Sequence, residues 1–188
     1  MPSDLKIWRC TAQILTLHIG SIEAINSAPK DPTIVRVALW RFAVNDFFKC
    51  FKRSASRKKL SADEVFQSDT EGRKIFKHYE DLRDKHIAHD ENAYSQCMAG
   101  AILNKVNSKD GIAEIISPVF TTQTFDQSAY SNIKLLCEKT ISWVEVEYDK
   151  VAFKIKTELE QIPYQELLKQ DMIVYRAPTP NEVSGNRN

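Results

Sequence analysis

The sequence feature that most constrains the fold is a helical periodicity running from about Asp126 to Gln161. Apolar residues recur there at steps of three and four positions, which places them on one face of an α-helix. They are Tyr130, Ile133, Cys137, Ile141, Val144, Tyr148, Val151, Ile155 and Leu159. A helix of roughly 35 residues is about 50 Å long, which is longer than one small core requires. The run therefore predicts a helix that packs along much of the domain or is shared with a second subunit.

Two earlier helices are predicted, from about residue 3 to 28 and from about residue 33 to 53. The second carries apolar residues around almost its whole circumference, so we expect it to be central and buried. Asn45 and Asp46 interrupt its apolar surface. Buried polar groups of this kind are expected to have hydrogen-bond partners.

After residue 90 the pattern changes, and a β-hairpin is predicted over about residues 96–124. Asp110-Gly111 is typical of a tight connection, and the half that follows is rich in β-branched residues. The first half is also compatible with a helix. Residues 171–188 are polar and rich in Pro, Gly and Asn, so a disordered tail is predicted. The expected fold is one mainly α domain over residues 1–170, an antiparallel helical bundle with the hairpin inserted before its long C-terminal helix.

Composition narrows the class of protein. The chain has 188 residues, which suits one domain, and its net charge of +1 excludes a strong overall attraction to nucleic acid or membranes. Its 4 cysteines are scattered without the pairing of a metal site, as in a reducing compartment. No apolar run approaches the roughly 20 residues of a membrane span, and no signal-type segment is present. We therefore expect a cytoplasmic protein that does not bind a membrane.

The stretch Leu82–Asp90 concentrates ionisable residues at the end of a third long helical run. Its apolar stripe consists of Ile75, Phe76, Tyr79, Leu82 and Ile87. On an α-helical wheel of about 100° per residue, Arg83, His86 and His89 project onto this stripe. Asp84 falls on the opposite face. A helix whose inward face becomes ionisable is expected to bring chemistry, or a polar contact, into a packed interface.

This arrangement resembles the HEPN superfamily, and more narrowly its abortive-infection (AbiU-type) branch. Residues 83–89, Arg-Asp-Lys-His-Ile-Ala-His, match the Arg-Asp-Lys-x-x-Ala-His form of that branch, and the order of the helices extends the likeness over about residues 1–170. The resemblance implies a HEPN-like bundle with metal-independent endoribonuclease activity, at a site formed where two copies of the motif meet in a homodimer. It implies an RNA substrate, a role in phage defence or in a toxin–antitoxin pair, an antitoxin protein as a possible partner, and no cofactor.

The resemblance also implies roles for three residues. His89 would act as general base or acid on the ribose 2′-hydroxyl and the leaving 5′-oxygen. Arg83 would hold the scissile phosphate and stabilise its developing charge. Asp84 occupies the polar position after the arginine, where it would orient a catalytic group. Because the wheel places Asp84 on the outer face, it either reaches a dimer partner or is a surface residue.

Each of these residues also has a structural interpretation. Arg83 suits an arginine that pairs with a carboxylate inside the protein, and His89 suits the C-terminal end of a helix. His86, Asn45 and Asp46 are accessory candidates for the site. A histidine placed like His86 is more often a core or interface histidine, and Asn45 and Asp46 suit a hydrogen-bonded core pair better than a site.

Two further possibilities concern ligands. The first concerns a basic run that includes Lys52, Arg53, Arg57 and Lys58. This run would either bind RNA phosphates or form a solvated loop. The spacing of His86, His89 and the adjacent aspartate allows a metal site, but no HExxH motif or cysteine pair accompanies it, so no metal is expected.

Two functions other than a ribonuclease are also compatible with the sequence. One is a non-catalytic HEPN-like dimeric module that binds a nucleotide, RNA or a protein partner. Another is a structural helical dimer in which the buried Arg and His only fix the packing. Binding without turnover would indicate the first, and a sharp loss of thermal stability on replacement of Arg83 or His89 would indicate the second.

Overall fold

The computed structural model describes residues 3–27, 33–54, 57–89, 93–106, 110–122, 124–170, 177 and 179–182. Most of these residues are helical, so the predicted mainly α class is confirmed. The helices are α1 (Ser3–Ser27), α2 (Thr33–Lys49), α3 (Ala62–Val65), α4 (Thr70–Leu82), the π-helix η1 (Arg83–Ile87), α5 (Gln127–Leu159), α6 (Tyr164–Leu167) and the 3-10 helix η2 (Pro180–Glu182). Of the tail predicted to be disordered, residues 171–176, 178 and 183–188 lie outside the described residues.

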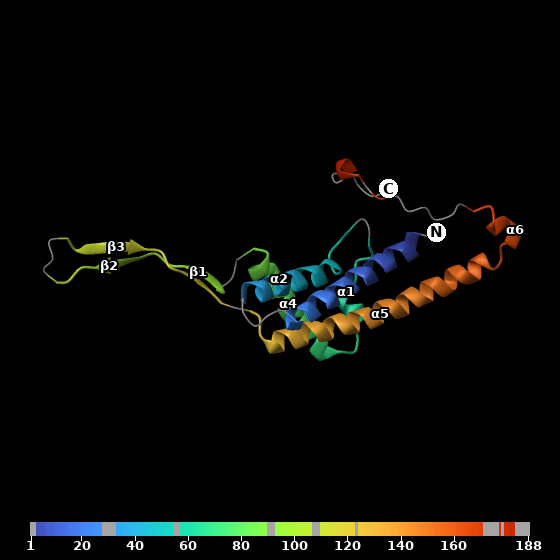
Figure 1. Ribbon diagram of the computed structural model, residues 1–188. Helices are drawn as coiled ribbons and strands as arrows, with labels where there is room; N and C mark the ends of the chain where they lie inside the picture. The colour runs from blue at the N-terminus through green and yellow to red at the C-terminus, as the bar shows by residue number, and fades with distance from the viewer. Residues whose placement is uncertain are drawn as a thin grey trace.

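Helices α1, α2, α4 and α5 form the bundle, in which α1 packs against both α2 and α5 (Figure 1). The starts of α4 and α5 are fixed by aspartate caps. Asp69 accepts a 2.8 Å hydrogen bond from the Gly72 amide, and Asp126 accepts one of 2.7 Å from the Ala129 amide. Asp69 also pairs with Lys139, which ties the start of α4 to α5. The Lys139 hydrogen bond and the Gly72 amide lower the pKa of Asp69.

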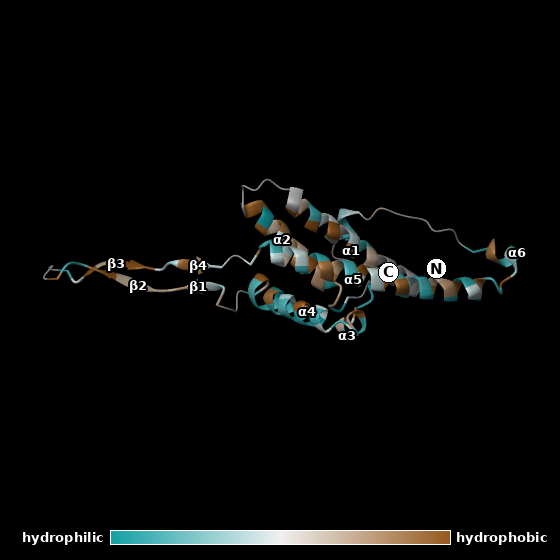
Figure 2. Cartoon of the chain, turned by 90° about the horizontal axis from the view of Figure 1, so that it is seen from below, coloured by the Kyte–Doolittle hydropathy of each residue, from teal (hydrophilic) through white to brown (hydrophobic). Residues whose placement is uncertain are grey.

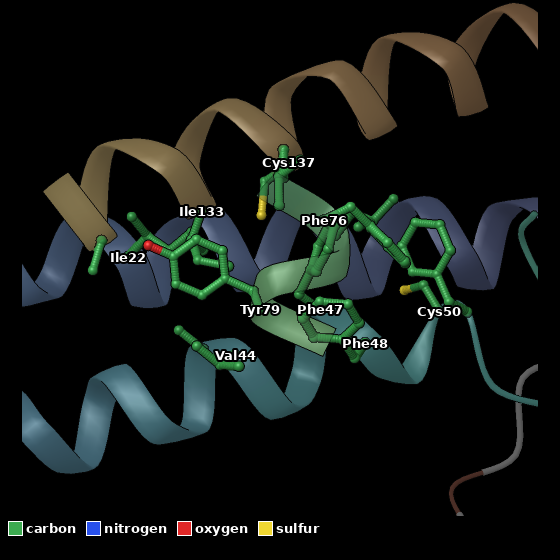
Figure 3. Packing of buried hydrophobic residues seen from close by; sticks show 14 of the residues in the cluster. Ile22, Val44, Phe47, Phe48, Cys50, Phe76, Tyr79, Ile133 and Cys137 are labelled. Carbon is green, nitrogen blue, oxygen red and sulfur yellow. The ribbon is translucent and has the colours of Figure 1, made fainter. Parts of the chain in front are cut away.

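An aromatic cluster fills one end of the core between α2 and α4 (Figure 3). The rings of Phe48 and Phe51 lie 5.0 Å and 4.7 Å from that of Phe76, measured between centroids. Figure 3 shows Ile133 and Cys137 of α5 facing the same interior. Interlocking rings of this size account for much of the apolar burial that stabilises a small domain.

The prediction that α2 is buried all round is wrong for one side of the helix. Trp40, Val44 and Phe47 are buried, but the side chains of Ile34 and Phe42 are largely exposed. Neighbouring helices cover one side of α2 only. Apolar content around a helix cannot distinguish a surface covered by the same chain from one left for a partner.

Helix α5 follows the predicted boundaries closely, but only its first half belongs to the core. Its buried residues run from Ala129 to Val144. The second half extends beyond the bundle (Figure 1) and exposes Phe153. The helix is therefore longer than its own core, as its length predicted.

The hairpin predicted over about residues 96–124 is present as two antiparallel strand pairs. The outer pair is β2 (Gly100–Leu103) with β3 (Ile112–Ile116), and the inner pair is β1 (Ser95–Cys97) with β4 (Val119–Thr121). We call residues 95–106 and 110–121 the arm. It extends away from the bundle (Figure 1), and Figure 2 shows β3 and β4 as largely hydrophobic.

No helix within the described ranges combines the length and the apolar character that crossing a membrane requires.

Candidate functional site

The candidate site is built on a π-turn that ends the α4 helix. The amide of Ala88 donates to the carbonyl of Arg83 over 2.9 Å, five residues back instead of four. Single π-turns occur frequently at functional sites because they re-aim side chains within a helix. The turn packs against α2. Its wider winding means that an α-helical wheel misplaces residues 83–87.

Arg83 is anchored on two sides. Its side chain is 24% exposed. Its Nε donates to Oδ1 of Asn45 on α2 over 3.2 Å, and its Nη1 donates to Oδ1 of Asp84 over 2.5 Å. Within the described residues, Nη2 makes no hydrogen bond. The guanidinium is therefore held in a fixed orientation with one nitrogen left for a ligand.

Asp84 lies within the same cluster, not on an isolated outer face as the α-helical wheel predicted. Its Oδ2 accepts a 3.2 Å hydrogen bond from Nζ of Lys52, which also donates to Oε1 of Glu80 over 3.3 Å. Partial burial raises the pKa of Asp84, but the hydrogen bonds from Arg83 and Lys52 outweigh it and hold that pKa below its usual value. Asp84 is thus an ionised bridge between two cations.

The two histidines of the turn occupy opposite environments. His89 is exposed just after η1, and its side chain forms no hydrogen bond within the described residues. His86 is 1% exposed, with its ring edge-on to that of Tyr94 at 5.5 Å between centroids. His89 is therefore accessible to a ligand in solution, whereas His86 is buried beside Tyr94.

The central helix contributes one of its two polar candidates. Asn45 joins the cluster through Arg83. Asp46 pairs instead with Lys49 one turn further along α2, so it lies outside the cluster. The two do not form the hydrogen-bonded pair that was one interpretation of the sequence.

The basic run does not gather at one place. Lys52 belongs to the cluster, but Arg57 folds back and donates twice to the Lys49 carbonyl, over 3.1 Å and 2.5 Å. It thereby caps the C-terminal end of α2. Arg53 and Lys58 are exposed, and Lys58 borders a separate hollow beside Trp143 of α5.

No three His, Cys, Asp or Glu side chains in the described parts of the chain come together in a group able to hold a metal ion. Asp90, part of the spacing that allowed such a site, lies outside the described residues.

A cavity that the sequence did not predict lies beside the cluster. It has a volume of about 520 Å³ and is bordered by α2, His86 and the segment that joins the arm to α5. The only sequence signal for it is Arg41, which precedes Asn45 by one helical turn on α2. The residues from the joining segment, including Thr122, Thr124 and Phe125, arrive through the fold and carry no local pattern.

Comparison with known proteins assigns this site to no family: no protein-family model, curated protein or solved structure matches the chain. The likeness to the HEPN superfamily rests on the motif at residues 83–89 and on the order of the helices. A functional assignment therefore depends on the chemistry of the cluster.

Proposed function

We propose that this chain is a metal-independent endoribonuclease of the HEPN type that acts as a homodimer in the cytoplasm. The observation that carries the proposal is a fixed Arg83 guanidinium in η1, together with an exposed His89 two residues after the end of that turn. These are the two groups that cleavage of RNA by its own 2′-hydroxyl requires. Lys52 adds a second cation beside Arg83.

In the proposed reaction, His89 accepts the proton of a ribose 2′-hydroxyl. The resulting O2′ attacks the adjacent phosphorus, the bond from phosphorus to the 5′-oxygen breaks, and that oxygen takes a proton from an acidic group. In a dimer the second His89 supplies that acid. The products are a 2′,3′-cyclic phosphate and a 5′-hydroxyl. Imidazole suits both steps because histidine as a class titrates near neutral pH.

Arg83 would bind a non-bridging oxygen of the phosphate through its remaining nitrogen. Charge develops on those oxygens in the transition state, and a fixed donor stabilises it without reorganising. Asn45 and Asp84 supply that rigidity, since each accepts one nitrogen of the guanidinium. On this proposal they are positioning residues.

The proposed dimer is supported by exposed apolar surface at the end of the bundle that carries the site. Eight large apolar residues of the arm have at least 45% of their surface exposed. They are Met98, Ile102, Leu103, Val106, Ile112, Ile115, Val119 and Phe120. At about 100 Å² each they present roughly 800 Å², the area that each partner buries in an interface of standard size.

The strand register sets several of these residues opposite apolar partners across the arm. Ala101 is paired with Ile115 and Leu103 with Ile112, with a register shift between Ile102 and Leu103, and the two residues of each pair point to the same side. A hairpin of two strands is at best marginally stable in water without a covered apolar face. A second copy carries the same arm with the same exposed apolar residues. We therefore propose that the arm of a second copy of this chain covers the apolar surface of the arm.

The biological context follows from the resemblance alone. A role in phage defence or a toxin–antitoxin pair, with an antitoxin protein as partner, would make overproduction of the chain arrest growth. His89→Ala would then relieve the arrest, because the arrest depends on RNA cleavage.

The proposal is tested by incubating the purified protein with single-stranded RNA in EDTA and analysing the product ends. We expect 2′,3′-cyclic phosphates, and a loss of at least about 100-fold in rate for His89→Ala and Arg83→Ala. His78→Ala is the matched control, because His78 is an exposed histidine on α4 away from the cluster. Intact RNA after incubation with folded dimer would contradict the proposal.

The structural helical dimer, in which the buried Arg and His only fix the packing, is the second candidate, favoured by one observation. The ion pair between Arg83 and Asp84 is also what a structural arginine would form. This candidate predicts no RNA cleavage by the wild type and a sharply lower melting temperature for Arg83→Ala.

A further inference from the structure

One buried side-chain polar atom that lacks a hydrogen-bond partner in the described structure belongs to a residue lining the cavity beside α2. It is Nδ1 of His86. A second such atom, Nε of Arg36, belongs to a residue outside the lining, whose guanidinium lies over the ring of the lining residue Phe125 at 5.2 Å from Cζ to the centroid. Buried polar groups are otherwise paired almost without exception. The unpaired Nδ1 of His86 indicates that a polar ligand completes this cavity.

The walls of the cavity suit a flat heterocycle. Trp40 and Phe125 contribute aromatic surface, and Ile34, Val37 and Ala38 of α2 contribute apolar surface. Its volume of about 520 Å³ lies within the range of small-molecule sites. A mainly apolar wall with a few fixed polar groups is the usual composition of a site for an aromatic ligand.

The polar groups of the cavity are suited to the edge of a nucleobase. Arg41 and the hydroxyls of Thr121, Thr122 and Thr124 line it. Thr124 is held in place, because its hydroxyl oxygen accepts a 3.3 Å hydrogen bond from the indole nitrogen of Trp40. Arginine donates only, whereas threonine donates and accepts. A lipid chain or another purely apolar ligand would leave all of these groups unpaired.

The cavity lies next to the phosphate site of the proposed ribonuclease. Arg41 precedes Asn45 by four residues on α2, which puts their Cβ atoms on one face about 6 Å apart. His86 follows Arg83 by three residues on the adjacent turn. Arg41 and His86 therefore connect the cavity to the two elements that carry Asn45 and Arg83.

We propose that this cavity binds the nucleobase next to the phosphate held by Arg83. The inference rests on the proposed function for the identity of that phosphate. The stacking surface comes from Phe125, and the hydrogen bonds come from His86, Arg41 and the threonine hydroxyls that line the cavity. The cavity is therefore the element that selects which nucleotide of an RNA is cleaved.

The test measures binding of the four nucleoside 3′-monophosphates to the full wild-type chain by titration calorimetry. Ribose 5-phosphate and inorganic phosphate are the ligands that lack a base. We expect at least one nucleotide to bind at least tenfold more tightly than ribose 5-phosphate. Equal affinity for nucleotides and ribose 5-phosphate would overturn the proposal, and that comparison needs no variant.

A matched pair of variants locates the site. Ala38→Trp places an indole in this cavity, whereas Ser128→Trp places one in the neighbouring cavity of about 480 Å³ between α4 and α5. With both folded by circular dichroism, we expect Ala38→Trp to weaken nucleotide binding at least tenfold and Ser128→Trp to change it less than twofold. Equal effects of the two variants would also overturn the proposal.

These measurements distinguish failure of the cavity proposal from failure of the ribonuclease proposal. Base-dependent binding without RNA cleavage supports the nucleobase cavity and rejects the ribonuclease. Cleavage by a protein that binds nucleotides no better than ribose 5-phosphate supports the ribonuclease and rejects the cavity.

Discussion

The Nε of Arg83 donates a 3.2 Å hydrogen bond to Oδ1 of Asn45, a residue 38 positions earlier in the chain. This contact joins the π-turn to the central helix and fixes the plane of the guanidinium. Asp84 holds a second nitrogen of the same group. The orientation of the Arg83 guanidinium is thus fixed by two hydrogen bonds, one to α2 and one to the neighbouring Asp84.

Replacing Asn45 tests the value of that contact. We expect Asn45→Ala to lower the free energy of unfolding by about 1.5 kcal/mol, because a partly buried cation loses an acceptor. We also expect RNA cleavage to slow about tenfold as Arg83 gains freedom. Urea titration and cleavage rates measure the two effects. Asp46→Ala is the control on the same helix, since Asp46 pairs with Lys49 outside the cluster.

Asp84 predicts a pH dependence of stability. Its folded pKa lies below its unfolded value, because the hydrogen bonds from Arg83 and Lys52 outweigh partial burial. Its contribution is therefore complete above the unfolded pKa of about 3.9 and is lost as the pH falls through the folded pKa. We expect Asp84→Asn to destabilise the protein by less than about 1 kcal/mol at pH 7, given solvent screening.

Urea titrations of wild type and Asp84→Asn between pH 3 and pH 7 measure this difference. The two curves should run parallel above about pH 5 and converge below about pH 4. A difference that grows as the pH falls would contradict the assigned direction.

Much of the fold was predictable because the helices carry strong local periodicity. Helix α5 was predicted from Asp126 to Gln161 and runs from Gln127 to Leu159. The exposed half of α2 was not predictable, since an apolar face intended for a partner resembles one that is buried. The β-hairpin was recognisable from its turn and its β-branched residues.

The site was predicted only in part, for a physical reason. Arg83 and His89 were identified from the motif, but the α-helical wheel separated Asp84 from Arg83. The π-turn is decided by packing against α2 and leaves no periodic signature in the sequence. Lys52 reaches Asp84 from a loop 32 residues away, and loop paths of this kind are not encoded locally.

The cysteines predict a selective reactivity. Burial raises the pKa of Cys50 to about 12, and Cys137 is also buried with a raised pKa. Cys97 is exposed on β1. Because only a thiolate reacts, we expect maleimide at pH 7.5 to label Cys97 in the native protein and to reach Cys50 and Cys137 only in denaturant.

Peptide mapping of the labelled protein measures this pattern in a Cys10→Ser background, where Cys97→Ser is the control that should remove the rapid native signal. Labelling of Cys50 as fast as Cys97 would contradict the burial of Cys50 in the core.

The arm predicts an oligomeric state. We expect the wild-type chain to have twice the monomer mass of 21.6 kDa in solution, and Leu103→Glu combined with Ile115→Glu to yield monomer. The reason is that Leu103 and Ile115 are large apolar residues that are exposed on the arm. Light scattering after size exclusion measures the mass.

Glu114→Lys with Lys105→Glu is the matched control for that double variant, because it changes two exposed charged residues of the same arm and leaves the net charge unaltered. Equal dimer content in the apolar and the charged variants would show that the arm does not hold the second copy.

In the proposed mechanism, Arg83 and His89 direct attack by a ribose 2′-hydroxyl on the phosphate. The measurement compares an RNA with an oligonucleotide of the same sequence that carries 2′-deoxyribose throughout, both in EDTA. We expect cleavage of the RNA to 2′,3′-cyclic phosphate ends and no cleavage of the deoxy strand. Cleavage of both strands, or of neither by a folded dimer, would contradict it.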